Sequence, residues 1–154
     1  MKGNELKLRR KIEQHEIIGL DTAPLNYFIE DVVPYAELLD GSFALLEAKK
    51  LRAVTSTVSL AEILTKPLAE KKFALVDEIK FALKALPALS IVPVDEKLAG
   101  AAALIRARFL IRLPDAIQLA AAIQGGATLF VTNDKRIKKI DALDVLVLSD
   151  YLHG

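Results

Sequence analysis

The sequence predicts a single α/β domain in which a five-stranded, mostly parallel sheet is covered by helices on both faces. Three observations lead to this fold class. Strand-like and helix-like segments alternate along the chain, the strand-like segments are apolar throughout, and 154 residues are the usual length of one domain. The hydrophobic content of 53% is sufficient for a sizeable core without disulfides.

Five short apolar runs, rich in β-branched residues, predict the strands. A run that is apolar at every position is typical of a strand buried on both faces, as in a parallel sheet. These runs are residues 17–20, 53–57, 89–94, 128–132 and 145–148.

The segments between these runs carry apolar residues at helical spacing, in residues 35–46, 73–83, 98–105 and 117–123. Their alternation with strands favours right-handed crossovers, some of them lengthened by extra helices. The stretch 66–87 is longer than one crossover needs, so we expect part of a helical hairpin beside the sheet. Gly125 and Gly126 are placed to end the helix before the fourth strand.

Composition excludes several classes of function. The chain has no cysteine, so disulfides, thiolate chemistry and a cysteine zinc site are ruled out, and a reducing cytosol fits. The polar start lacks the apolar core of a signal peptide, and no run approaches the ~20 apolar residues of a membrane span. We therefore expect a soluble, cytoplasmic protein.

Charge and glycine pattern narrow the function further. With 21 basic and 20 acidic residues, any binding of nucleic acid has to come from a local patch. Neither the G-x-x-x-x-G-K-[ST] pattern nor the G-x-G-x-x-G pattern occurs, which disfavours nucleotide-triphosphate and dinucleotide binding.

Four carboxylates occupy the same topological position in the predicted fold. Asp21 follows the first strand, Glu62 is placed in the first turn of the helix after the second, Asp115 opens a helix after Pro114, and Asp134 follows the fourth strand. In an open parallel sheet, the points where strands end and helices begin lie along one edge, where ligands bind. We expect the four side chains to converge there.

Each acid taken alone is also explained as a helix-start residue, since capping favours such positions; Ser59-x-x-Glu62, for example, has the form of a capping box. The conjunction of four is what predicts a metal site. Clustered carboxylates repel and raise one another's pKa unless a cation compensates, and oxygen ligands without histidine suit Mg²⁺ or Mn²⁺.

The residues around these acids also resemble the four motifs of PIN-domain nucleases, in order, over residues 16–150. The chain looks like the VapC-type toxin ribonucleases and their solitary relatives. The most specific piece is Thr132-Asn133-Asp134 after an apolar strand. The motifs read Ile17-Ile-Gly-Leu-Asp21-Thr22, Ser59-Leu-Ala-Glu62, Pro114-Asp115-Ala116-Ile117-Gln-Leu-Ala-Ala and Phe130-Val-Thr-Asn133-Asp134.

The resemblance implies a PIN-like three-layer α/β/α fold over residues 16–154, after an N-terminal extension of residues 1–15. It implies a metal-dependent endoribonuclease that hydrolyses RNA phosphodiester bonds, as a VapC-like toxin of a toxin–antitoxin pair, with an antitoxin partner and a homodimer. One or two Mg²⁺ or Mn²⁺ ions would be held by Asp21, Glu62, Asp115 and Asp134, the catalytic residues. Groups that orient carboxylates and water would be Thr22, Thr132 and Asn133.

Basic side chains near these motifs are candidates for phosphate contacts. Lys135, Arg136, Lys138 and Lys139 follow Asp134, and three arginines precede Asp115. A charge run is usually a solvated face, and we interpret at least half of them in that way. The candidate RNA-binding residues are Arg106, Arg108, Arg112, Lys135 and Arg136.

Other features are expected to be structural. His15 and His153 lie near the ends, where we expect exposed positions and no zinc site. Phe73, Phe81 and Tyr35 have helical apolar spacing and are expected in the core or an interface. The basic leader 7–11 is expected to fray or to form an extra helical turn.

Three alternatives remain. A PIN-like RNA-binding or scaffold module could have lost catalysis, although the acidic quartet is complete. A receiver or a haloacid-dehalogenase-like phosphatase also places Asp after its first strand, but needs an acidic pair or Asp-x-Asp, where this chain has Asp21-Thr-Ala23. A flap-type DNA nuclease would need more chain than is present.

Overall fold

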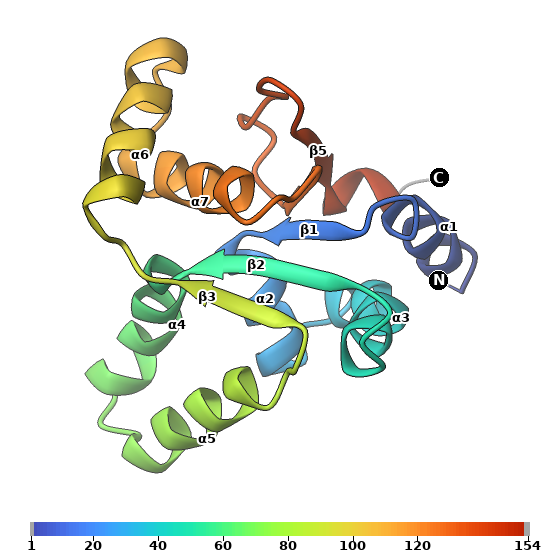
Figure 1. Ribbon diagram of the computed structural model, residues 1–154. Coiled ribbons are helices and arrows are strands. Elements are labelled where there is room, and N and C mark those ends of the chain that lie inside the picture. Colours follow the sequence, from blue (N-terminus) through green and yellow to red (C-terminus); the bar gives the residue numbers. More distant parts are fainter. Residues whose placement is uncertain (1, 153–154) are drawn as a thin grey trace.

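A computed structural model describes residues 2–152, which form three layers with a central sheet between two layers of helices (Figure 1). Every strand pair is parallel, and the strand order is β3-β2-β1-β4-β5. The predicted fold class is confirmed, and the sheet is entirely parallel. The strands are β1 (Ile17–Leu20), β2 (Arg52–Ser56), β3 (Leu89–Val92), β4 (Leu129–Thr132) and β5 (Asp144–Val147).

The helices fill the crossovers as predicted, with two helices in each of the three longest connections. They are α1 (Lys2–Ile12), α2 (Thr22–Glu30), α3 (Tyr35–Glu47), α4 (Thr57–Ala69), α5 (Phe73–Lys84), α6 (Glu96–Phe109) and α7 (Leu113–Gln124), followed by a 3₁₀ turn η1 (Leu148–Tyr151). The pair α4 and α5 is the expected hairpin beside the sheet (Figure 1).

Two apolar cores lie on opposite faces of the sheet. The larger one packs α1 to α5 against the sheet around Phe43, and the smaller one packs α6 and α7 around Phe130. Helix α7 approaches very closely, because a Cβ atom on Gly19 would lie 2.6 Å from the Cβ of Ala122. This close approach packs the last turn of α7 directly against β1.

Helix α4 begins earlier than the sequence predicted. Ser56 is the N-cap and its hydroxyl accepts a hydrogen bond from Val58 N at 3.2 Å. The expected capping box at Ser59 is therefore wrong, and Glu62 lies in the second turn of the helix. Ser59 instead turns its hydroxyl inward, where it is buried.

The basic leader is an ordered part of the fold, so the expectation of fraying or a single extra turn is wrong. Residues 2–12 form helix α1, which packs along α3 and contacts η1 (Figure 1). Leu8 and Ile12 are fully buried in this contact. Burial of two large aliphatic side chains, each worth about 1.5–3 kcal/mol, holds the helix in place.

The aromatic side chains expected in the core or an interface differ in their outcome. Phe73 and Phe81 on α5 are 62% and 75% exposed, so a core position is wrong for both, and an interface position stays a prediction. Tyr35 is half-buried, packs against the larger core as expected and stacks on Tyr27 with ring centroids 4.5 Å apart. The expectation of an exposed position is wrong for His15, which is half-buried with Nδ1 2.7 Å from Thr128 Oγ1, while His153 lies outside the described residues.

Within residues 2–152, no helix is long and apolar enough to cross a membrane.

Candidate functional site

The four predicted acids line one cavity of about 460 Å³ at the carboxyl edge of the sheet. Each comes from a different part of the chain: Asp21 from the β1–α2 junction, Glu62 from α4, Asp115 from the first turn of α7, and Asp134 from the loop after β4. The topology brings them together because β1, β2 and β4 are parallel neighbours at the centre of the sheet. We call this cavity the acidic pocket.

Asp21 lies deepest and is the most firmly held. Its Oδ1 caps α2 by accepting a hydrogen bond from Thr22 N at 2.9 Å, and its Oδ2 accepts one from Thr132 Oγ1 at 2.7 Å. Its backbone N–H donates to Val131 O at 3.0 Å. Strand β4 therefore positions Oδ2 and the main chain, and the start of α2 positions Oδ1.

Burial raises the pKa of Asp21 above its ordinary value, and the charges of Asp115 and Glu62 raise it further. The hydrogen bonds from Thr132 and Thr22 oppose this effect but do not cancel it. Removing the carboxylate from water thus costs free energy that a nearby cation would offset.

Glu62 is joined to the interior through a chain of hydrogen bonds. The amide Nε2 of Gln118 donates to Thr22 Oγ1 at 3.1 Å, and Thr22 Oγ1 in turn donates to Glu62 Oε1 at 3.1 Å. Thr22 also lies 3.0 Å from the hydroxyl of Ser59. One threonine thus connects an exposed carboxylate to a buried polar cluster.

Gln118 is the organising residue that the sequence analysis missed. It is only 2% exposed and bridges two helices and a strand end, since Ser56 Oγ donates to its Oε1 at 2.7 Å and its Nε2 also donates to Ser59. Its position offered one signal, because it lies three residues after Asp115 and therefore on the same helix face. A buried amide with its partners satisfied fixes the packing of α4 against α7.

Asp115 and Asp134 are paired with arginines. Arg112 Nε lies 3.1 Å from Asp115 Oδ2, and Arg136 Nη2 lies 2.8 Å from Asp134 Oδ2. The Arg136 hydrogen bonds hold the pKa of Asp134 below its ordinary value. Both arginines are largely exposed, so these ion pairs can open at low cost.

The donor set fits a hard divalent cation, because all four side chains offer carboxylate oxygens and no sulfur or imidazole competes. Within residues 2–152, however, no three acidic or histidine side chains stand close enough to form a preassembled metal cluster. Two guanidinium groups supply positive charge where the carboxylates would otherwise repel. A metal would therefore require movement of the exposed Arg112 and Arg136 side chains.

Asn133 makes different contacts from those expected. Its amide donates to Tyr27 OH at 3.1 Å, and its Oδ1 accepts from Ser149 N at 2.9 Å. It thus ties the start of the β4–β5 loop to α2 and η1. Thr132 supports the same loop by accepting a hydrogen bond from Asp134 N at 3.1 Å.

Further polar residues of the acidic pocket were not singled out from the sequence. They form part of its rim through their positions one or two turns along α2 and α4, and they are Asn26, Glu30 and Lys66. Their helical spacing from Thr22 and Glu62 was the available signal.

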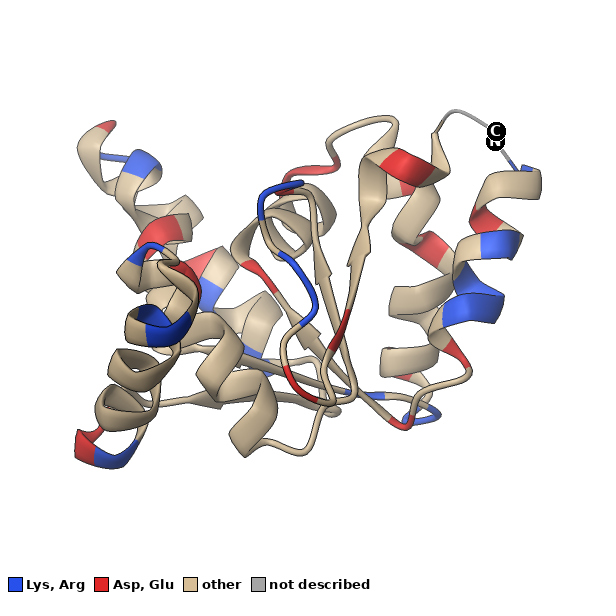
Figure 2. Cartoon of the chain, turned by 90° about the horizontal axis from the view of Figure 1, so that it is seen from above, with Lys and Arg blue, Asp and Glu red and all other residues tan. Residues whose placement is uncertain are grey.

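The candidate RNA-binding residues are not all at the acidic pocket. Arg112 lines it directly, and Arg136 is paired with Asp134. Lys135 lies 4.0 Å from Asp150, Arg108 lies 3.5 Å from Asp141, and Arg106 is exposed on α6. Figure 2 shows both signs of charge spread over the chain, which agrees with the near-neutral composition.

The family model of the PIN domain matches residues 19–143, which include all four acids. The chain belongs to the PIN domain family. The resemblance inferred from the sequence motifs is thereby confirmed. Comparison with curated proteins gives no match.

Solved structures agree on the fold of this PIN domain. VapBC2 from Rickettsia felis, bound to a DNA fragment from its promoter, superposes with a TM-score of 0.61 at 24% identity, covering 85% of this chain and 98% of that one. A toxin–antitoxin complex from Klebsiella pneumoniae gives a TM-score of 0.61 at 20% identity, with 82% and 94% covered. At these identities the likeness establishes the three-layer architecture.

Proposed function

We propose that this PIN domain is a divalent-metal-dependent endoribonuclease that hydrolyses RNA phosphodiester bonds, and that it acts in the cytoplasm as the toxin of a toxin–antitoxin pair. The observation that carries the proposal is the convergence of four carboxylates from four separate segments on one cavity. The motif resemblance and the two structural neighbours, both toxin–antitoxin proteins, support the biological role.

The residues proposed to hold Mg²⁺ or Mn²⁺ are Asp21, Asp115 and Asp134, with Glu62 completing the set or orienting water. A bound divalent cation would supply charge stabilisation for the phosphoryl oxygens during in-line displacement. The chain itself contributes orientation: Thr132 and Thr22 N fix both oxygens of Asp21, and Thr22 fixes Glu62. Asn133 holds the loop that carries Asp134.

The arginines have a second role in this proposal. Arg112 and Arg136 neutralise Asp115 and Asp134 in the structure described, and they are free to rotate outward because their side chains are 64% and 71% exposed. Rotated outward, they would pair with the RNA phosphates beside the scissile bond. Arg106, Arg108 and Lys135 are proposed as weaker, more distant contacts.

The competing function is a catalytically silent PIN-like module that binds RNA or acts as a scaffold. The observation in its favour is that two of the four acids already have arginine partners and no preformed metal cluster exists within residues 2–152. In that case the arginine pairs would be permanent structural contacts.

The test is Mn²⁺-dependent cleavage of labelled RNA by the wild type and by Asp21→Asn. Asparagine keeps the cap on α2 but removes the charge, so we expect at least about a hundredfold loss of cleavage, the scale of losing one well-placed electrostatic group. Asp40→Asn, the same change at an exposed position on α3, is the matched control. Equal cleavage by wild type and Asp21→Asn would overturn the proposed activity.

The same proposal includes a homodimer and an antitoxin partner. Helix α3 buries its apolar face in the core, whereas α5 leaves Phe73 and Phe81 exposed on the outer side of the hairpin. Exposed aromatics of this size are typical of a contact surface. Light scattering of the purified chain measures the assembly, and a strict monomer at high concentration would contradict the homodimer.

A further inference from the structure

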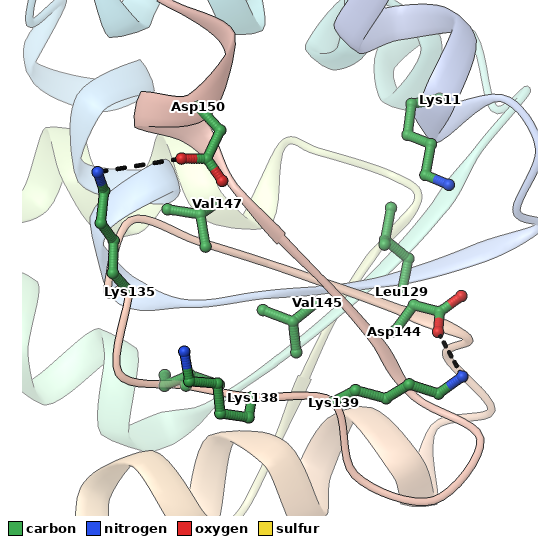
Figure 3. A pocket seen from close by; sticks show the side chains of 10 residues that line it. Lys11, Leu129, Lys135, Lys138, Lys139, Asp144, Val145, Val147 and Asp150 are labelled. Atoms are coloured by element: carbon green, nitrogen blue, oxygen red, sulfur yellow. Dashed lines mark ion pairs between the residues drawn. The ribbon is translucent and has the colours of Figure 1, made fainter.

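A second cavity, of about 610 Å³, lies along edge strand β5 and is lined by four lysines. We call it the lysine pocket. Lys11 reaches it from α1 on one side of β5, while Lys138 and Lys139 approach from the β4–β5 loop on the other, as Figure 3 shows. Lys135 is the fourth. The sequence suggested that the lysines after Asp134 flank the acids, but all three of them line this separate cavity.

Positive charge exceeds negative charge in the lysine pocket. Lys139 lies 3.1 Å from Asp144 and Lys135 lies 4.0 Å from Asp150, and both pairs are drawn in Figure 3. Within residues 2–152, no carboxylate lies within 4.0 Å of Lys11 or Lys138. Two ammonium groups are thus available to an anion from outside.

The walls between the lysines are apolar. Leu129, Val145 and Val147 line the cavity together with Ile137. A cavity that combines separated ammonium groups with an apolar wall fits a ligand with spaced negative charges and flat apolar parts between them. Single-stranded RNA has that pattern, with a phosphate on each nucleotide and a base beside it.

Residues of one short segment, 134–137, line both the acidic pocket and the lysine pocket. Asp134 and Arg136 border a small cavity beside the acids, and Ile137 lines both this cavity and the lysine pocket. A chain leaving the acidic pocket over Arg136 would reach Lys135 and Lys138 next. This continuity is what favours RNA over an acidic peptide as the occupant.

We propose that the lysine pocket is a second RNA-backbone site, which holds phosphates of the strand several nucleotides away from the acidic pocket. The proposal rests on the proposed nuclease function and extends it by giving the substrate a direction across the molecule, over the β4–β5 loop toward α1. Lysine suits this task because it binds phosphate as a point charge without requiring one fixed geometry.

Lysines beside an edge strand also have a simpler role, since charge near a free edge prevents unwanted pairing between sheets. That role needs no contact with RNA. Experiments that vary RNA length and salt concentration distinguish RNA binding from protection of the sheet edge.

The test variant is Lys11→Gln combined with Lys138→Gln, and the matched control is Lys50→Gln combined with Lys80→Gln, two exposed lysines elsewhere on the chain. Both are made in the Asp21→Asn background, so that RNA stays intact. Fluorescence anisotropy then measures binding of a labelled single strand of about sixteen nucleotides. We expect about tenfold weaker binding in the test variant only, and a salt slope smaller by about 1.4, for two lost phosphate contacts.

A second measurement uses the two lysine variants with Asp21 intact. An RNA of about four nucleotides, long enough for the acidic pocket alone, should be cleaved at the wild-type rate by both. Equal affinity of the test and control variants for the long RNA would overturn the inference. A loss of cleavage of the short RNA in the test variant as large as its loss of binding to the long RNA would also overturn it. So would tighter binding of a polyglutamate chain than of RNA to the lysine pocket.

The outcomes also separate this inference from the function on which it rests. If the wild type cleaves RNA but the lysine variants bind long RNA normally, only the second site is wrong. If the wild type neither binds nor cleaves RNA, the proposed function fails first.

Discussion

The acidic pocket and the lysine pocket share the β4–β5 loop but are built in opposite ways. In the acidic pocket, short side chains at strand ends and helix starts are held by buried hydrogen bonds, as Asp21 is held by Thr132 and Thr22. In the lysine pocket, long exposed side chains surround an apolar wall, and two of the four have a carboxylate partner.

This difference matches the different demands of chemistry and of binding. Chemistry needs reacting groups fixed within a fraction of an ångström, which short side chains on rigid elements provide. Tracking a flexible polyanion needs only charge at suitable intervals, and flexible lysines provide it at the cost of their conformational freedom. One loop can therefore serve both demands, with Asp134 at the acidic pocket and Lys138 at the lysine pocket.

Of the substitutions that separate the two pockets, Gln118→Ala is expected to have the largest effect on stability. The change removes a buried side chain and its hydrogen bonds to Ser56, Ser59 and Thr22, so the free energy of unfolding should fall by about 2–4 kcal/mol. The acidic pocket would lose its support, while the lysine pocket, on the far side of the loop, would keep its residues. Urea unfolding measures the stability.

Two further variants make this prediction specific. Gln124→Ala is the same substitution at an exposed position of the same helix and should change stability by less than about 0.5 kcal/mol. Gln118→Met keeps the volume but removes the hydrogen bonds, and should still cost about 1–2 kcal/mol. Wild-type stability in Gln118→Met would mean that the network contributes nothing.

The fold and the position of the four acids at one edge of the sheet could be predicted from the sequence for a physical reason. Strands buried on both faces are recognisable as apolar runs, and parallel connectivity then forces their carboxyl ends to one edge. Asp21 follows such a run directly and Asp134 follows one after a single residue, so little freedom remained for their placement. Even Glu62, assigned one helical turn too early, still faces the acidic pocket.

The remaining features depend on tertiary contacts that no local pattern records. Gln118 resembles any polar residue in a helix until α4 brings Ser56 and Ser59 to it. Lys11 reaches β5 only because α1 docks on α3 through Leu8 and Ile12, and a charged leader at a chain end gives a weak signal of docking. The apolar spacing of Phe73 and Phe81 was likewise insufficient to distinguish core from surface.

A smaller effect is expected from Asp21→Asn on stability in the absence of metal. Because the folded state raises the pKa of Asp21, the folded protein binds this proton more tightly than the unfolded chain does. The stability associated with the protonated form is therefore present below the ordinary Asp pKa, and it is lost as pH rises through the raised value. At neutral pH the buried charge of Asp21 lowers the free energy of unfolding of the wild type, and the neutral asparagine removes this loss.

Asp21→Asn should consequently raise the melting temperature at pH 7, by about 2–4 °C for each kcal/mol relieved in a chain of this size. The difference from wild type should shrink as pH falls below the ordinary Asp pKa, where the carboxyl becomes protonated in both states. Added Mn²⁺ should stabilise the wild type and leave Asp21→Asn nearly unchanged, since binding to the folded state alone raises stability. A variant less stable than wild type at pH 7 would show that the hydrogen bonds from Thr132 and Thr22, rather than the buried charge, dominate at Asp21. The acidic pocket would then differ from the lysine pocket in the rigidity of its side chains, but burial of the Asp21 charge would not lower the stability of the fold.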